Sequence, residues 1–424
     1  MLYFARGSKE DIITPDEVRA ILKSVFDGMG RKRRVLALPP DFTRANSYAG
    51  PITEMVYDYY GQALTDVMPA LGTHVPMTGQ QISTMFGHTP RDIFRVHDWR
   101  NDVVTVGEVP AEYVSQVSEG RVCYPWKAQV NKLLLDPSFD LILSIGQVVP
   151  HEVIGMANYN KNIFVGVGGA EGINKSHYLG ATYGMERIMG RAKSPVRDVM
   201  EYASQHFIKN LPIVYIQTVL SKDEEGQMRL RGLFIGDDFE CFRLASELAL
   251  EANFIMLEKP VRKCLVWLDP EEFKSTWLGN KAIYRTRMAL ADDAELIIMA
   301  PALREFGEDK AIDALIRKYG YKGTPATLKA VKENEDLQAN LGAAAHLIHG
   351  SSEGRFKITY CPGHDVTRQE IEGVGFLYGS LESVIARYRP DTLRDGWNIM
   401  PDGEEIYYIS NPALGLWAVP ERFN

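Results

Sequence analysis

Short apolar runs alternate with amphipathic stretches along most of the chain. Residues 14–17, Thr-Pro-Asp-Glu, combine a capping threonine, a proline suited to a first helical turn and a glutamate that closes a capping box. Apolar side chains then recur at helical spacing over residues 18–25, which predicts an amphipathic helix. The next apolar run, Arg34–Leu38, is stopped by Pro39 and Pro40 and indicates a buried strand.

The same alternation continues downstream. A helix is expected at Thr53–Leu64, followed by the apolar run Val67–Leu71, and Phe139–Ile145 is a strong strand candidate that ends at Gly146. Strands that alternate with helices form parallel βαβ units, so the pattern predicts an α/β fold with parallel or mixed sheets. Further strands are expected at Ile213–Val219, Leu233–Ile235, Cys264–Leu268, Glu295–Met299 and Phe356–Tyr360, with helices at Asp309–Lys318, Leu328–Ile348 and Leu381–Arg387.

The chain is long enough for two domains, since its 424 residues well exceed the roughly 150 of one typical domain. A turn at Glu258–Val261 precedes a fresh strand. We therefore expect an N-terminal α/β domain over residues 1–260 and a smaller C-terminal α/β domain over residues 261–424. Roughly the last 15–20 residues are expected to return to the N-terminal domain.

Composition narrows the class of protein. The chain is 45% hydrophobic and 24% charged, which excludes a disordered or low-complexity chain. Its net charge of -8 argues against nucleic acid as a partner, because such proteins are ordinarily basic. Four scattered cysteines without a CxxC pair exclude a disulfide scaffold and favour a reducing cytoplasm. Neither a signal peptide nor an apolar stretch of about 18 residues occurs, so no membrane partner is expected.

Polar, reactive residues follow three of the predicted N-terminal strands: Asp41–Arg44, Gly72–His74 and Gln147–His151. In open α/β sheets, ligands bind beyond the carboxyl ends of the strands. Arg44 offers a planar fork suited to a carboxylate or phosphate, and His74 can act as a general base near neutral pH. Taken singly, each of these residues also fits an ordinary surface ion pair or a solvated loop, as does His88.

A histidine and a lysine precede a glycine-rich run, and a second histidine follows it. Lys161 follows His151 by ten residues, His177 follows sixteen later, and Gly166–Gly169 lies between them. The run matches neither a Walker loop nor GxGxxG, and the chain contains no HExxH or GxSxG motif. Spacing alone therefore predicts a histidine-rich α/β site with one conspicuous lysine and leaves the reaction open.

Taken together, these segments resemble the lactate racemase family, whose members carry a nickel pincer nucleotide. The family pattern Asp-x-Thr-Arg is matched by residues 41–44, Gly-Thr-His-x-x-Met-Thr by residues 72–78, and Pro-His by residues 150–151. The family's later glycine, lysine and histidine are matched, at the same intervals, by Gly155, Lys161 and His177. The resemblance extends over residues 35–180 and continues more weakly beyond them.

The resemblance implies a role for each matched residue. Lys161 would anchor the cofactor through a thioamide, and His177 would be the protein ligand to nickel beside three donors from the organic pincer, an arrangement that suits Ni(II). His74 and His151 would form an acid/base pair on the two faces of the substrate. The remaining predicted contacts are Thr73 and Gly166 to the cofactor, and Arg44, Asp41, Lys281 and Trp277 to the substrate.

The implied activity is inversion of C2 of a 2-hydroxy acid by reversible hydride transfer. The implied cofactor is the pyridinium-3-thioamide-5-thiocarboxylic acid mononucleotide of Ni(II), supplied by dedicated biosynthesis enzymes. Because Trp277 and Lys281 lie in the predicted second domain, the active site is expected in the cleft between the domains.

Several positions depart from the family pattern. Met156–Lys161 replaces Tyr-Ser-Gly-Gly-x-Lys, Val75 replaces an arginine, Gly87–Thr89 replaces Asn-His-Asp, and Trp277-Leu278 replaces Tyr-Gln. The anchor, the metal ligand and both acid/base residues are retained, which indicates the same chemistry on a substrate that need not be lactate. Two other hypotheses stay open: a cofactor-free hydroxy-acid-binding protein, and a zinc hydrolase that uses His74, His151 and His177.

Overall fold

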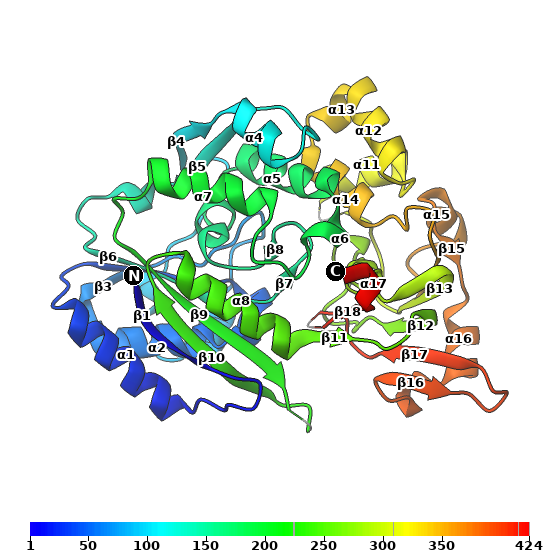
Figure 1. The fold of residues 1–424 in the computed structure, drawn as a ribbon, viewed down its shortest axis with the longest axis horizontal. Coiled ribbons are helices and arrows are strands. Elements are labelled where there is room, and N and C mark those ends of the chain that lie inside the picture. Colours follow the sequence, from blue (N-terminus) through cyan, green and yellow to red (C-terminus); the bar gives the residue numbers. More distant parts are fainter. Residues whose placement is uncertain (224, 308, 414, 424) are drawn as a thin grey trace. The chain divides into compact units, whose positions relative to one another are not determined.

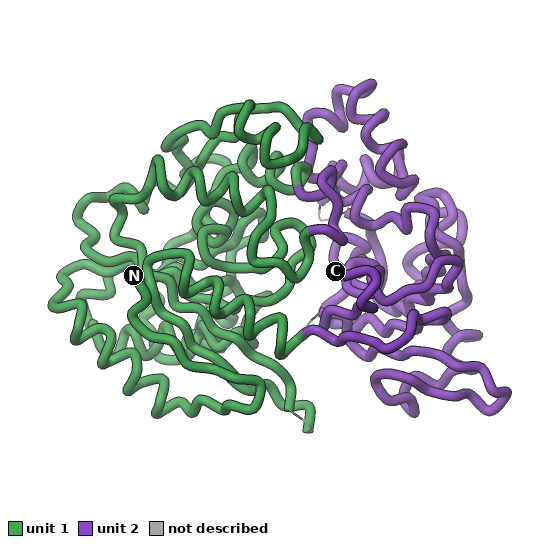
Figure 2. The backbone as a smooth tube through the Cα atoms, in the orientation of Figure 1, with its two compact units in different colours: residues 1–179, 188–253 green, residues 180–187, 254–424 purple. Residues whose placement is uncertain are grey.

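The computed structural model describes residues 1–223, 225–307, 309–413 and 415–423, and these residues form an α/β fold. They divide into two compact units (Figure 2). Unit 1 comprises Met1–Leu179 and Ile188–Asn253, and unit 2 comprises Gly180–Arg187 and Phe254–Asn424. The predicted α/β fold with two domains is thereby confirmed.

Unit 1 is built on a six-stranded mixed sheet in the order β1-β10-β9-β6-β2-β3 (Figure 1). The strands β9, β6, β2 and β3 run parallel to one another, whereas β10 and β1 are antiparallel additions at one edge. The bounds of these strands are β1 Leu2–Gly7, β2 Val35–Leu38, β3 Leu64–Val67, β6 Leu141–Gln147, β9 Ile213–Lys222 and β10 Met228–Gly236.

Helices cover both faces of this sheet. On one face, alternate side chains of β6 and β9, such as Leu143 and Ile216, pack with Leu22 and Phe26 of α1 in a single apolar core. On the other face α8 lies close to β10, where Gly232 leaves room for it: a Cβ at Gly232 would stand 2.5 Å from Leu248. The helices are α1 Pro15–Met29, α2 Ala49–Tyr60, α3 Gly79–Phe86, α4 Ala111–Val117, α5 Ala170–Tyr183, α6 Met185–Ile188, α7 Pro195–Phe207 and α8 Phe239–Asn253.

Unit 1 also contains two antiparallel strand pairs and a π-helical turn. The strands β4 (Val103–Val109) and β5 (Trp126–Asn131) pair antiparallel, as do the very short β7 (Pro150–His151) and β8 (Gly155–Met156). A π-helical turn at Asn162–Gly166 follows β8. Such turns are rare and are often found at functional sites.

Unit 2 has its own six-stranded sheet, in the order β15-β14-β13-β12-β17-β16, with only β16 antiparallel to its neighbour. A separate parallel pair joins β11 to β18. The strands are β11 Phe254–Met256, β12 Val261–Trp267, β13 Leu290–Ala300, β14 Lys357–Pro362, β15 Leu377–Tyr378, β16 Gly396–Ile399, β17 Glu405–Ile409 and β18 Leu416–Ala418. The helices are α9 Thr276–Gly279, α10 Lys281–Thr286, α11 Lys310–Tyr319, α12 Thr324–Glu333, α13 Glu335–Gln338, α14 Leu341–His349, α15 Arg368–Gly373, α16 Leu381–Tyr388 and α17 Pro420–Phe423.

Most of the predicted elements are present. The capping box at Thr14 and Glu17 is formed, and the strands expected at Phe139–Ile145 and Ile213–Val219 are β6 and β9. Two predictions are wrong. The strand expected at Val67–Leu71 is instead β3 at Leu64–Val67, so it begins at the residue where the preceding helix was expected to end. The single helix expected at Leu328–Ile348 is three helices, α12, α13 and α14. Asn334 and Asn340 interrupt it because both adopt non-helical backbone angles, and Asn340 caps the helix that follows.

Candidate active site

The carboxyl ends of β2 and β3 carry the first two predicted segments. The backbone N–H of Ala70 donates to the carbonyl oxygen of Pro39 at 2.7 Å, which joins the segments that follow the two strands. Gly72 adopts the left-handed region, with φ of 57°, and its N–H donates to the carbonyl oxygen of Gly166 at 2.8 Å. The loop that carries His74 is thereby fastened to the glycine-rich run.

The third segment is fixed to the same edge of the sheet by Asn162. Its Nδ2 donates to the carbonyl oxygen of Leu38 at 2.9 Å and to Oγ of Ser144 at 3.0 Å, so it bridges β2 and β6. Lys161 immediately precedes Asn162. The predicted grouping of polar segments at the carboxyl edge of the unit 1 sheet is therefore present.

Asp41 and His74 form a hydrogen-bonded pair. Asp41 is buried and caps the short helix Phe42–Ser47, while its second carboxylate oxygen lies 2.7 Å from Nδ1 of His74. Burial opposes ionisation of Asp41, but the hydrogen bonds from His74 and Thr43 outweigh it and hold the pKa of Asp41 below its ordinary value. Because a carboxylate only accepts, His74 donates from Nδ1, and a neutral His74 ring carries its lone pair on Nε2.

Asp41 was predicted to lie beside Arg44 at the substrate carboxylate. In the structure its carboxylate contacts His74. The side chain of Arg44 has no hydrogen-bond or ion-pair partner among the residues that the structure describes. Its charge nevertheless acts on Asp41, His151 and Lys161, which places its guanidinium within the same cluster. Arg44 is thus the cation of the cluster that is available to an anionic ligand.

His151 is buried in the β7–β8 hairpin. Its Nδ1 accepts a hydrogen bond of 3.1 Å from the backbone N–H of Val153, so a neutral ring carries its proton on Nε2. Burial holds the pKa of His151 well below its ordinary value, and the charge of Lys161 acts in the same direction against the opposing Glu152. His151 is therefore a neutral imidazole at physiological pH.

Lys161 carries an amine whose pKa is lowered and which has no polar partner among the described residues. Its Nζ makes no hydrogen bond or ion pair with another described residue, and burial followed by the nearby charge of Arg44 lowers its pKa to about 8. About a tenth of the amine is consequently unprotonated at pH 7. An unprotonated amine is the nucleophilic form of lysine.

His177 lies on α5, one turn after Ile173. Its Nδ1 donates to the carbonyl oxygen of Ile173 at 2.7 Å, which leaves the lone pair on Nε2. Burial lowers the pKa of His177 to about 4, although that hydrogen bond opposes the shift. A metal-binding histidine needs a neutral ring whose other nitrogen donates to a protein oxygen, and His177 has both properties.

The zinc hypothesis finds no support in this geometry. Within the described part of the chain, no group of three or more histidine, cysteine or carboxylate side chains could hold a metal ion. His74, His151 and His177 therefore do not form a three-ligand zinc site, whereas a pincer cofactor asks for one protein ligand.

The remaining predicted residues fall into two groups. Gly166 is a packing position, since a Cβ there would lie 2.8 Å from Ala70, and Thr73 lies in the loop between Gly72 and His74. Trp277 and Lys281 belong to unit 2, where the Trp277 ring lies 4.4 Å from that of His346 and Nζ of Lys281 lies 3.8 Å from Glu272. Thr73 and Lys281 both have further partners.

His88 is placed away from this cluster. Its two ring nitrogens lie 2.6 and 2.8 Å from Glu54 and Asp58 of α2, and the hydrogen bond to Asp58 raises its pKa. With its side chain 61% exposed, His88 forms a surface ion-pair cluster.

Two residues of the site region carry no sequence signal. His97 is buried and donates from Nε2 to the carbonyl oxygen of Gly168 at 3.0 Å, so it holds the glycine-rich run. Arg197 is buried behind the segment that precedes Lys161. Neither lies in a recognisable motif, and only the three-dimensional structure connects them to the site.

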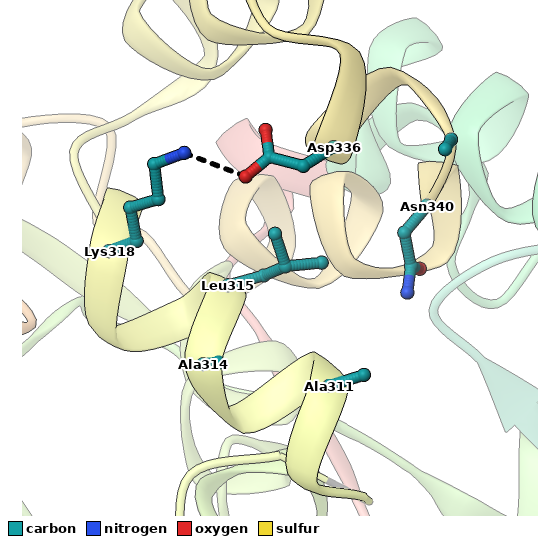
Figure 3. Close-up of a pocket in the computed structure, with 7 residues that line it drawn as sticks. Ala311, Ala314, Leu315, Lys318, Asp336 and Asn340 are labelled. Carbon is teal, nitrogen blue, oxygen red and sulfur yellow. Dashed lines mark hydrogen bonds and ion pairs between the residues drawn. The ribbon is translucent and has the colours of Figure 1, made fainter.

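A surface depression of about 400 Å³ in unit 2 contains none of these residues. Figure 3 shows that Lys318 and Asp336 at its rim pair with each other, at 2.7 Å. The remaining lining is mostly short and apolar, including Ala311, Ala314 and Leu315. This depression offers no chemistry comparable to the unit 1 cluster.

Fold and site together describe an α/β protein whose unit 1 sheet carries the segments of His74, His151 and Lys161 beyond the carboxyl ends of its parallel strands. Residues 21–187 match the lactate racemase N-terminal domain. These residues therefore form an N-terminal domain of the lactate racemase family.

Two solved structures have the same fold. A protein from Thermotoga maritima is 22% identical, with a TM-score of 0.81 over 96% of this chain and 98% of that one. The lactate racemase apoprotein from Thermoanaerobacterium thermosaccharolyticum is 15% identical, with a TM-score of 0.67 over 97% and 93%. No curated protein matches the chain, and none of the described helices is both long and apolar enough to cross a membrane.

Proposed function

We propose that this protein is an isomerase, a racemase or epimerase that inverts C2 of a 2-hydroxy acid with a nickel pincer nucleotide. The observation that carries the proposal is the presence of two complementary groups, both half-buried, whose charges act on each other within unit 1. Lys161 presents an amine without a partner and with a pKa of about 8, and His177 presents a neutral ring with its lone pair on Nε2. These are the two groups that a covalently anchored nickel cofactor requires.

The residues present fit such a cofactor. Lys161 would hold it covalently, and Nε2 of His177 would bind its nickel. When bound there, the cofactor would supply the acceptor for the hydride that leaves Cα of the substrate. Its synthesis and attachment would depend on dedicated enzymes, which are proposed partners of this protein in the cytoplasm.

The chain's own residues would then bind the substrate and move its protons. Arg44 would hold the carboxylate in a bidentate pair. His74, with Nδ1 fixed by Asp41, would accept the hydroxyl proton at Nε2. His151 would deliver its Nε2 proton to the oxygen of the 2-oxo acid on its other face, and the proton held by His74 would pass to His151 and restore its neutral ring. In the reverse direction the two imidazoles exchange roles, so both enantiomers are served.

The test is the mass of the peptide that contains Lys161, together with the nickel content, after coexpression with the cofactor-synthesis enzymes. We expect a covalent adduct on Lys161 and nickel in equal amount to the chain. Lys161→Arg should abolish the adduct, whereas His177→Ala should retain the adduct and lose the nickel. A wild-type protein with neither adduct nor nickel would contradict the proposal and favour a cofactor-free hydroxy-acid-binding protein.

A further inference from the structure

The segment that precedes Lys161 contains an unusual backbone turn. Asn158 and Tyr159 are consecutive and both adopt the left-handed region, with φ of 66° and 59°. Side chains other than glycine rarely adopt this region, and a bulky residue such as tyrosine does so least of all. Surrounding contacts must therefore hold the turn in place.

Arg197 of α7 supplies those contacts. Its side chain is 1% exposed, and one guanidinium nitrogen donates to the carbonyl oxygen of Met156 at 2.7 Å. The other terminal nitrogen donates to the carbonyl oxygen of Asn158 at 3.3 Å and to Oδ1 of Asn160. One planar fork thus binds the segment before, within and after the left-handed turn.

The ring of Tyr159 is held on the same side. It stacks on Phe242 with centroids 5.1 Å apart and contacts Tyr215 at 4.4 Å. The guanidinium of Arg197 lies 4.3 Å above the Phe242 ring, so the arginine and the tyrosine share one aromatic wall. Contacts to the backbone of the turn and to the side chain of Tyr159 therefore both hold it in place.

Lys161 stands between two fixed asparagines. Asn160 is fully buried and donates from Nδ2 to Glu201 at 3.0 Å and to Ser204 at 3.2 Å, in addition to accepting from Arg197. On its other side, Asn162 is bound to Leu38 and Ser144. The backbone of Lys161 is consequently defined on both sides, and on one of them Arg197 is the common element.

We propose that Arg197 is the positioning residue of Lys161: it clamps the left-handed turn at Asn158 and Tyr159 and so determines where the Lys161 amine stands in the site. This inference rests on the proposed role of Lys161 as the covalent anchor. Arg197 itself touches no reacting group, and it acts only through the turn and through its charge.

The protonation of Lys161 reports on the clamp. Opening the turn would admit water to the amine, and removal of the Arg197 charge would ease its protonation, so both effects raise the pKa of Lys161. The charged and titratable groups that act on Lys161 are Arg44, Asp41, Glu152, Arg197, His151 and His177.

The experiment uses the full-length protein without cofactor. Acylation of Lys161 by an amine-reactive reagent is followed against pH by peptide mass spectrometry, with the exposed Lys209 as internal reference. Arg197→Met should move the midpoint of the Lys161 profile upward by about one pH unit, equivalent to a roughly tenfold loss of unprotonated amine at pH 7. Arg197→Lys, which keeps the charge and loses the fork, should give an intermediate shift.

Arg231→Met is the matched control, because Arg231 is a buried arginine of the same unit that binds Ser221 and the carbonyl oxygen of Asp11. It should leave the Lys161 midpoint unchanged. If Arg197→Met does not fold, Asn160→Ala removes the link between Arg197 and Lys161 and should shift the midpoint in the same direction. A folded Arg197 or Asn160 variant with the wild-type midpoint, or an equal shift in the control, would overturn the inference.

The outcome is separable from that of the proposed function. If the Arg197 variants shift the midpoint but the protein never acquires the pincer adduct, the role of Arg197 stands and the proposed cofactor is rejected. An adduct that forms on Lys161 while the midpoint is the same in all variants would retain the cofactor and reject the clamp.

Discussion

The three imidazoles of the unit 1 cluster differ in which ring nitrogen donates a hydrogen bond. His74 and His177 donate from Nδ1, to Asp41 and to the Ile173 carbonyl oxygen, whereas His151 accepts at Nδ1. One proposed acid/base residue therefore presents a lone pair at Nε2 and the other a proton. The resemblance to the family, and not spacing alone, singled out these three histidines. Their tautomers could not be predicted from the sequence, because the tautomers depend on backbone groups that only the fold brings into range.

Asp41→Asn tests the orienting pair. The amide no longer forces Nδ1 of His74 to donate, so the tautomer with a basic Nε2 is lost. We expect kcat/KM for racemisation to fall by about 10²- to 10⁴-fold without loss of folding. The matched control is Asp58→Asn, which removes a carboxylate partner of the surface His88 and should leave kcat/KM unchanged. Equal activity of the two variants would remove Asp41 from the mechanism.

The depressed pKa of His177 predicts an acid-sensitive stability. The unfolded ring takes up a proton near pH 6.5, whereas the folded ring resists protonation until about pH 4, so the unfolded chain binds more protons between these values. Stability should fall as the pH falls from 6.5 to 4, and His177 should account for up to about 3 kcal/mol of that loss.

Urea unfolding of the cofactor-free protein at pH 6.5 and 4.5 measures this effect. His177→Gln should flatten the pH dependence, whereas His206→Gln, at an exposed position of α7, should leave it as in the wild type. An identical pH dependence in wild type and His177→Gln would contradict a half-buried neutral ring at this position.

Among the secondary-structure elements, the central strands and α1 follow from the sequence, whereas the helices α5, α7 and α8 and the site-forming irregularities were not predicted. Apolar runs such as Val35–Leu38 and Leu141–Gln147 have no other way to bury their side chains, so their prediction is secure. The π-helical turn at Asn162–Gly166 and the left-handed pair before Lys161 depend on tertiary contacts from Leu38, Ser144 and Arg197. Local propensity carries no information about such contacts.

The β7–β8 hairpin makes a sharper prediction about an element. Gly155 has φ of 92°, and a Cβ there would collide with the carbonyl oxygens of Arg191 and Ile188. Gly120 has a similar φ of 76°, but a Cβ there would meet nothing within 4 Å. Gly155→Ala should therefore cost at least about 2 kcal/mol more than Gly120→Ala in the free energy of urea unfolding. Equal costs would show that the hairpin tolerates displacement and does not fix His151.

For the whole chain, composition and pattern predicted the fold class but not how the chain divides between its two units. The helix α5 carries His177 within unit 1, while residues 180–187 group with unit 2. There Glu186 pairs with Arg287 at 2.9 Å and with Arg355 at 2.8 Å. These partners lie about 100 and 170 residues away, so no local pattern indicates them. The predicted boundary near Glu258 divides the sequence at a single point. The two observed units are defined by contacts, so residues 180–187 group with the second half of the chain.

The most direct test of the proposed activity is chiral analysis of the nickel-loaded protein after incubation with single enantiomers from a panel of 2-hydroxy acids. We predict that at least one acid is converted into a mixture of both configurations at C2. His74→Ala and His151→Ala should each abolish the conversion while the adduct on Lys161 persists. Retention of configuration for every acid by a fully loaded wild-type protein, or conversion that survives loss of both imidazoles, would contradict a two-histidine racemase.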